Sequence, residues 1–421
     1  MCILLRGGMC LALLALTGGR LAAQVASWPD YRGEDFSGYV EQADVPLEWG
    51  EGRNIRWKCK VPGTGWSSPV IEAGVAWLTT STDTGQELHV LAFDVESGKQ
   101  LLDRVVFANA TPEKKNKLNS FASPSPVIAG GHVYVHFGSY GTACVDAKSR
   151  EVLWERRDIN CDHMEGPGSS PVLYQDLLIF NVDGGDVQYV IALDRKTGQT
   201  KWRTDRSVDF GKLPADLRKA YSTPITVRVG GRWQLLSTGA QASYAYDPNT
   251  GEELWRLRFR GFSMAPRPLF GDGKVYLTTG FARAQMLAVD VSGEGDVTKD
   301  NLVWSYRRNV PKMSSPVLVG RRIYMVDDSG FATCLDCETG EAVWRERIGG
   351  EHCASPLCVG DRIYFFDRSG QTVVLARSDE FKRLATNQLD DGFMSSPAVI
   401  GDDLILRTRS HLYRIGTPNG N

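Results

Sequence analysis

The stretch Ala192–Trp202, with the sequence A-L-D-R-K-T-G-Q-T-K-W, decides the fold of this chain. The carboxylate of its Asp can accept hydrogen bonds from the backbone of the following turn, and its glycine is free to adopt positive φ. The residues on either side have the character of short strands. The stretch therefore predicts a β-hairpin whose second strand carries a tryptophan as a large buried anchor.

The same pattern recurs along the chain, which indicates a repeat protein rather than a series of unrelated domains. Further copies are Ala92–Leu102, Cys144–Trp154, Ala245–Trp255 and Cys334–Trp344. Another copy opens at Ala288 and is split by an insertion before Trp304, and the copy at Ala92 carries leucine in the tryptophan place. The tryptophans predicted to dock blades together are Trp57, Trp154, Trp202, Trp255, Trp304 and Trp344.

A second motif, usually Ser-Pro followed by an apolar run, alternates with the hairpins. Its prolines are Pro69, Pro126, Pro171, Pro224, Pro266, Pro316, Pro356 and Pro397. Successive prolines lie 40 to 57 residues apart, which leaves room for about four strands in each interval. Eight such units predict an all-β, eight-bladed propeller, in which stacking of the blades buries both apolar faces of each sheet.

The two ends of the repeat region complement each other. The strand-like stretch Asn54–Val61 has no hairpin before it, and the last repeat, Ser396–Gly416, has no Thr-Gly hairpin after its strands. We therefore expect residues 54–61 to form the outer strand of the last blade and to close the ring. This gives a propeller over residues 54–416, an arm over residues 27–53 packed on one face through its Trp and Tyr side chains, and a tail over residues 417–421.

The first 26 residues have the character of a signal peptide. Arg6 supplies a positive charge, Met9–Leu16 is apolar, and Leu21–Ala23 offers a small-residue cleavage site before Gln24. The apolar run is too short to span a bilayer as a permanent helix. We expect an exported monomer, periplasmic or extracellular, without a membrane span. The formal charge of −2 gives no overall field that would attract nucleic acid.

The cysteines and one acidic loop match the patterns of metal-binding sites only in part. Seven cysteines remain after the signal peptide, and the pair Cys334 and Cys337 has metal-ligand spacing, but Cys334 occupies the small-residue place of the hairpin repeat. The insertion Asp290–Asn301 resembles a calcium-binding loop in the spacing of its acidic residues, although its twelfth place is Asn rather than Glu. We interpret these as structural or free thiols and a solvated acidic turn, and predict no metal ligand and no catalytic residue.

The A-x-D-x-x-T-G-x-x-x-W hairpin resembles the tryptophan-docking motif of eight-bladed propellers of the pyrroloquinoline quinone (PQQ) type. The whole chain resembles exported bacterial PQQ-like repeat proteins, related in fold to the propeller lipoprotein of the outer-membrane barrel-assembly machine. In that group the name describes the repeat and not a bound quinone. Quinoprotein dehydrogenases share a vicinal Cys-Cys disulfide above the cofactor, and this sequence has no Cys-Cys pair and no C-x-x-C-H haem motif.

Propeller geometry places the best candidate surface at the mouth of the central channel, where the loops before the innermost strands should meet. The candidate binding residues are Trp66, Phe121, His163, Glu165, Tyr221, Met313, His352, Phe393 and Met394. Aromatic and methionine side chains with a few titratable groups are typical of ligand or peptide pockets, and equally of residues that plug the channel.

The sequence leaves three functions open. The first is a non-catalytic scaffold that binds a protein or peptide partner in the cell envelope, without a cofactor. The second is an oxidoreductase that uses PQQ with calcium. The third is a polysaccharide-binding propeller that uses the Trp-rich arm and the mouth.

Overall fold

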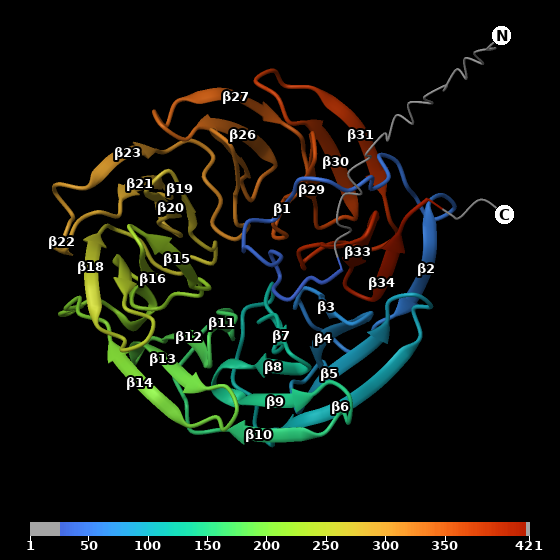
Figure 1. Ribbon diagram of the computed structural model, residues 1–421, viewed down its shortest axis with the longest axis horizontal. Coiled ribbons are helices and arrows are strands. Elements are labelled where there is room, and N and C mark those ends of the chain that lie inside the picture. Colours follow the sequence, from blue (N-terminus) through green and yellow to red (C-terminus); the bar gives the residue numbers. More distant parts are fainter. Residues whose placement is uncertain (1–25, 418–421) are drawn as a thin grey trace, which may run out of the picture.

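The computed structural model describes residues 26–417, and it confirms the predicted all-β, eight-bladed propeller. Eight antiparallel sheets of four strands stand around a central axis, and two of them gain a fifth, parallel strand (Figure 1). In the first seven blades, the first of the four antiparallel strands lies innermost and the fourth lies at the rim. The predicted signal peptide and the tail lie outside the described residues, except for Ala26 and Thr417.

Each of the first seven blades takes its four antiparallel strands in chain order from one repeat. Blades 1 to 3 contain β3 (Val70–Glu72), β4 (Val75–Ser81), β5 (Glu87–Asp94), β6 (Gln100–Ala108), β7 (Val127–Ala129), β8 (His132–His136), β9 (Thr142–Asp146), β10 (Val152–Arg156), β11 (Val172–Tyr174), β12 (Leu177–Asp183), β13 (Gln188–Asp194) and β14 (Thr200–Asp205). Blades 4 and 5 contain β15 (Ile225–Val229), β16 (Arg232–Gly239), β17 (Ala242–Tyr246), β18 (Glu253–Arg258), β19 (Leu269–Gly271), β20 (Lys274–Thr278), β21 (Met286–Asp290), β22 (Gly295–Asp296) and β23 (Leu302–Tyr306).

The remaining elements complete the ring. Blades 6 to 8 contain β24 (Val317–Val319), β25 (Arg322–Val326), β26 (Phe331–Asp336), β27 (Ala342–Arg347), β28 (Leu357–Val359), β29 (Arg362–Phe366), β30 (Gln371–Ala376), β31 (Arg383–Gln388), β32 (Ala398–Ile400), β33 (Asp403–Arg407) and β34 (His411–Ile415). The arm contributes β1 (Tyr39–Val40), and the strand after it is β2 (Ile55–Lys60). Two short 3-10 helices, η1 (Gly138–Tyr140) and η2 (Ala215–Leu217), lie in loops.

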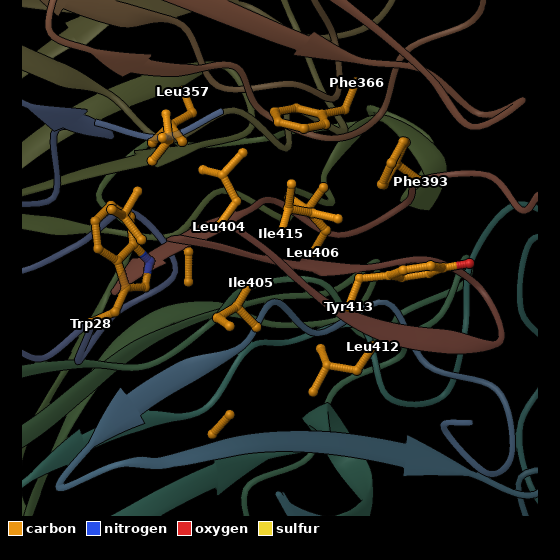
Figure 2. Close-up of a cluster of buried hydrophobic side chains, with 14 of the residues drawn as sticks. Trp28, Leu357, Phe366, Phe393, Leu404, Ile405, Leu406, Leu412, Tyr413 and Ile415 are labelled. Atoms are coloured by element: carbon orange, nitrogen blue, oxygen red, sulfur yellow. The ribbon is translucent and has the colours of Figure 1, made fainter. Parts of the chain in front are cut away.

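The predicted closure of the ring is confirmed. Strand β2 pairs with β34 in antiparallel fashion, with Trp57 opposite Arg414 and Lys60 opposite His411. The last blade therefore takes three strands from the end of the repeats and one from their beginning. An apolar cluster spans this seam, and Figure 2 shows Trp28 of the arm in it, near Leu357 and Leu404.

Tryptophans fasten most neighbouring blades together. Each indole N–H donates to a backbone carbonyl in the outer hairpin of the next blade, which fixes one blade against the other. The bonds run from Trp57 to Val95 (2.8 Å), Trp154 to Arg195 (3.0 Å), Trp202 to Pro248 (3.1 Å), Trp304 to Cys337 (3.0 Å) and Trp344 to Ser378 (3.0 Å). Four of these rings lie so close to a turn glycine that a Cβ atom would come within 3 Å of the indole, at Gly98, Gly198, Gly251 and Gly340.

Three of the eight interfaces lack this bond. Between blades 7 and 8, the outer strand β31 carries no tryptophan. Between blades 1 and 2, Leu102 stands in the tryptophan place and Arg150, with φ +64°, in the glycine place; the Arg150 guanidinium donates to the carbonyl of Leu101 at 2.5 Å. Between blades 4 and 5, the indole of Trp255 donates instead to Gln234 of its own blade at 3.1 Å. The turn on which Trp255 was expected to dock is replaced by the insertion.

The insertion Asp290–Asn301 forms a strap between blades 4 and 5. Its strand β22 pairs in parallel with β18, and the Val297 N–H donates to the carbonyl of Arg256 at 2.9 Å. The Asp290 and Asp296 carboxylates accept hydrogen bonds from neighbours within the strap, at Ser292 and Thr298. The insertion thus replaces the missing tryptophan contact with a backbone pairing.

The structure corrects the position of the fifth Ser-Pro motif. Strand β19 starts directly after Pro268, just as β3 starts directly after Pro69 and β24 after Pro316. Arg267-Pro268 is therefore the copy in blade 5, two residues later than Ala265-Pro266. Arg267 therefore stands where most other blades carry a serine.

All seven cysteines of residues 26–417 are free thiols, and burial raises the pKa of each of Cys144, Cys334 and Cys358 to about 12. Within the same residues, no helix has the length and hydropathy needed to cross a bilayer.

Candidate functional site

The N-terminal arm closes one end of the central channel, which we call the base. It crosses the middle of the ring in Figure 1 and contacts the innermost strands of several blades. Trp28 exchanges two backbone hydrogen bonds of 2.8 Å with Ile71, and Tyr39–Val40 pairs in parallel with β28. The arm therefore joins blade 1 to blade 7 and covers the base.

A buried ion pair holds the arm in place. The Arg267 guanidinium donates to both oxygens of Asp30, at 2.5 and 2.9 Å, and the two side chains are only 1% and 3% exposed. Burial lowers the pKa of Arg267, but the negative charge of Asp30 outweighs it, so that the pKa lies above its usual value. The Arg267 guanidinium also lies over the ring of Tyr31, 4.6 Å from its centre. The arginine that replaces the blade-5 serine is therefore the anchor of the arm.

Arg32 adds a second anchor from the arm side. Its guanidinium donates to the carbonyls of Pro356 at 2.5 Å and Pro316 at 3.1 Å, and also to Ser37 within the arm. Burial lowers its pKa to about 10. Because these carbonyls belong to the Ser-Pro motifs of blades 6 and 7, the arm is fixed directly to the innermost part of the ring.

Above the arm, the channel widens into a cavity of about 540 Å³ that opens at the other end, the mouth. We call this cavity the cup. Tyr31 lines it from the base, and its hydroxyl makes no hydrogen bond to residues 26–417. The loops before the innermost strands line its walls and its mouth.

A ring of hydroxyl groups surrounds the cup, one from each blade except blade 5. Its members are Ser68, Ser125, Ser170, Thr223, Ser315, Ser355 and Ser396, all of which line the cavity. Each hydroxyl oxygen accepts a backbone N–H of the preceding blade, at 2.8 to 3.1 Å; the N–H comes from the matching motif residue, which is Arg267 in the case of Ser315. None of the seven donates its own hydrogen to an atom of residues 26–417, so these hydrogens can be donated to a molecule in the cup.

Five of the nine candidate binding residues line the cup: Trp66, Glu165, Tyr221, Met313 and Met394. The Trp66 indole donates to the carbonyl of Leu118 at 2.9 Å, and the Tyr221 hydroxyl donates to the carbonyl of His163 at 2.7 Å. Hydrogen bonds thus hold the two aromatic side chains in position at the wall.

The other four candidates are buried and are not among the residues that line the cup. Phe393 packs in the closure cluster, edge-on to Phe366 at 5.3 Å, and His352 lies between the carbonyls of Phe366 and Gly349. Phe121 packs edge-on against Tyr140. Burial lowers the pKa of His163 to about 4, and its Nε2 accepts the Ser139 N–H at 3.0 Å. These side chains support the walls from behind.

The charged side chains of the cup are three carboxylates and one amine. They belong to Glu165, Asp216, Asp328 and Lys219. The Lys219 ammonium is already paired with Asp216 and, at 3.4 Å, with Glu165. Burial raises the pKa of Asp328, whose carboxylate accepts the backbone N–H of Lys312. The cup is therefore acidic rather than basic.

Sequence reasoning missed several residues of the cup. The aromatic rings of Phe262 and Phe281 lie 6.4 Å apart at the mouth, and Asn116 and Asn119 add amide groups. The hydroxyl ring carried a readable signal, since the residue before the proline is Ser or Thr in seven of the eight motifs. Tyr31 gave no such signal, because its place follows from contacts of the arm with distant blades.

Comparison with known proteins supports the fold. The family model described as outer membrane protein assembly factor BamB matches residues 64–204 and 186–421. A europium-containing methanol dehydrogenase has a TM-score of 0.68 at 11% identity, over 90% of this chain and 89% of that chain. BamB from Moraxella catarrhalis has a TM-score of 0.57 at 13% identity, over 86% and 99%.

A third solved structure is also similar to this chain. Quinohemoprotein alcohol dehydrogenase ADHIIG from Pseudomonas putida HK5 has a TM-score of 0.63 at 13% identity, over 94% of this chain and 81% of that chain. A search of curated proteins finds no match to this sequence. At such identities the structures demonstrate a shared fold, and the chemistry has to be argued from the side chains of the cup.

The residues of the cup do not fit PQQ. This cofactor is a tricarboxylate, and a site for it needs cationic donors, whereas the cup offers three carboxylates and a lysine that is already paired. Among residues 26–417, no group of three or more His, Cys, Asp or Glu side chains is placed to hold a metal ion. The arrangement is better suited to neutral groups that accept hydrogen bonds from hydroxyls.

Proposed function

Because the chain belongs to the family of the outer membrane protein assembly factor BamB, we propose that it is a non-catalytic scaffold that binds a protein or peptide partner in the cell envelope. The family description names an assembly factor, which supports a protein partner. The signal-peptide character of residues 1–26 supports export to the periplasm or beyond. The partner's segment enters the cup at the mouth, while the arm keeps the base closed.

The observation that carries this proposal is the ring of hydroxyl hydrogens that find no acceptor within residues 26–417. Backbone carbonyls of a peptide are suitable acceptors for these hydrogens. Because the seven donors stand around one axis, a peptide loop can bind to them in several orientations. Trp66, Tyr221, Met313 and Met394 supply apolar surface around these donors. Binding of this kind needs no reacting group, which agrees with the lack of a recognisable catalytic set in the sequence.

Affinity capture from envelope extracts tests the proposal. A Trp66→Ala variant should lose about tenfold or more of the partner's affinity, because truncating a central aromatic residue of an interface commonly has effects of this size. The matched control is Trp233→Ala, which removes a 41% exposed tryptophan that does not line the cup. Equal capture by the wild type and both variants would refute a role of the cup.

A cofactor-binding assay and a glycan-retention assay distinguish the scaffold from the two alternative functions. Incubation with PQQ and calcium, followed by gel filtration, should leave no bound chromophore on the protein and no dye reduction with alcohols. A stoichiometric chromophore would favour the oxidoreductase instead. Saturable retention on an insoluble glycan that is lost in Trp66→Ala would favour the polysaccharide-binding function.

A further inference from the structure

A second cavity, of about 440 Å³, lies beside the mouth between blades 5 and 6. It shares only Asp328 with the lining of the cup, and its walls come from the loops around Arg283, Arg307 and Lys312. We call it the side cleft. Its chemistry is opposite to that of the cup, because cationic side chains predominate.

The two acids of the side cleft are already occupied. The Asp327 carboxylate accepts the backbone N–H groups of Ser329 and Phe331 and the side-chain amide of Asn309 at 2.7 Å. The Asp328 carboxylate accepts the Lys312 backbone N–H and lies 3.5 Å from the Lys312 ammonium. Asp328 therefore offsets Lys312, and Asp327 is engaged in its own turn.

Two guanidinium groups remain without a carboxylate among residues 26–417. Arg307 makes one hydrogen bond, from Nε to the side chain of Gln285 at 3.0 Å, which leaves its two terminal nitrogens free to donate. Arg283 makes no hydrogen bond or ion pair within the described residues. A third arginine, Arg345, does not line the cleft but donates to Asn309 of its wall at 2.7 Å. The field in the cleft is therefore positive.

From this arrangement we infer that the side cleft binds carboxylate groups of an acidic peptide segment, held by Arg283 and Arg307. Planar guanidinium groups bind carboxylates through paired hydrogen bonds. Asp327 and Asp328 favour a monoanion over a phosphate dianion at this site, since they lower the net positive charge. The inference rests on the proposed binding of a protein partner, and it adds that the segment beside the cup carries Asp or Glu.

The test uses fluorescence anisotropy of two labelled peptides, hexaglutamate and hexaglutamine, added to the purified full chain at low salt. The wild type should bind hexaglutamate at least about tenfold more tightly, because charge-assisted hydrogen bonds to a carboxylate are stronger than those to a neutral amide. The double variant Arg283→Ala/Arg307→Ala should lose this preference. The control Arg308→Ala removes an exposed neighbour that does not line the cleft and should keep it.

Each other outcome overturns the inference. Equal affinity for both peptides, or an equal loss in Arg308→Ala, would mean that the cleft has no specific role. Competition by inorganic phosphate but not by free glutamate would point to a phosphate site, and binding of phosphatidylglycerol vesicles without hexaglutamate binding would point to a membrane surface. Thermal melting of each variant shows whether it is folded. Because the cup is tested separately with Trp66→Ala, failure of the cleft leaves the proposed function open to its own test.

Discussion

The base of the central channel is held by a buried ion pair, whereas the cup above it is surrounded by hydroxyl groups whose hydrogens have no acceptor in residues 26–417. The same position of the repeat makes this difference. Seven blades place Ser or Thr there, and blade 5 places Arg267, which turns the ring contact into an anchor for the arm. One substitution in a repeat can therefore specialise one end of a propeller for stability and leave the other available for binding.

The comparison predicts the largest effect at the base. Asp30→Ala leaves the Arg267 guanidinium buried without a counter-charge, and should lower the free energy of unfolding by about 3 to 5 kcal/mol in urea titrations. The double variant Asp30→Ala/Arg267→Met removes both charges and should recover most of the loss. A loss below about 1 kcal/mol in the single variant would show that the ion pair does not hold the arm.

Acid should destabilise the protein through two buried imidazoles, His136 and the wall residue His163. Burial lowers the pKa of His136 to about 3 and of His163 to about 4, below the usual value of about 6.5 in the unfolded chain. The unfolded chain therefore binds protons first, so the stability present above pH 6.5 decreases as the pH falls toward 4. Each imidazole should remove about 2 kcal/mol between pH 7 and pH 5.

Urea titrations across this pH range check the prediction. His163→Gln, which keeps a polar side chain without a titrating ring, should make stability less dependent on pH than in the wild type. An unchanged slope in that variant would show that His163 titrates normally. The raised pKa of Arg267 keeps the base anchor charged throughout.

A smaller effect is expected within the hydroxyl ring itself. Ser170→Ala removes the acceptor of the buried Ser125 N–H, which lies 2.9 Å from the Ser170 hydroxyl, and should destabilise the protein by about 1 to 2 kcal/mol. Ser170→Thr should restore most of this, since blade 4 carries Thr223 in the same place. If alanine and threonine variants were equally stable, the ring would contribute nothing to blade contacts.

The smallest effect on stability is expected at Tyr31, where base and mouth meet. Tyr31→Phe keeps the ring against Arg267 and removes a hydroxyl that has no partner in residues 26–417. Stability should change by less than about 0.5 kcal/mol. Binding of a partner segment should weaken measurably, because a donor in the cup is lost; unchanged binding would indicate that the segment does not reach the arm.

The fold was predictable because the repeat states it many times. The hairpin around Ala192–Trp202 recurs with the same turn chemistry, and the incomplete repeats at both ends indicate the pairing of β2 with β34. The position of the fifth Ser-Pro motif was predicted wrongly because the repeat is irregular there. Ala265-Pro266 precedes Arg267-Pro268, and spacing alone does not show which proline starts the strand.

The site was less predictable, because it depends on contacts between distant parts of the chain. Spacing before the prolines found Trp66 and Tyr221, but it did not show that His352 and Phe393 turn into the core. The place of Tyr31 depends on Asp30 meeting Arg267, 237 residues away in the sequence. Such pairings follow from the closed ring and not from any local pattern.

Site-specific photo-cross-linking tests the central claim most directly. The photoreactive residue is placed at Met394, which lines the cup, or at Glu34, which is exposed on the arm at the base, and cells are irradiated before the envelope is extracted. We predict a discrete adduct with one envelope protein from position 394 and none from position 34. An adduct formed only from position 34 would contradict the account, because the partner would then bind the base and not the mouth.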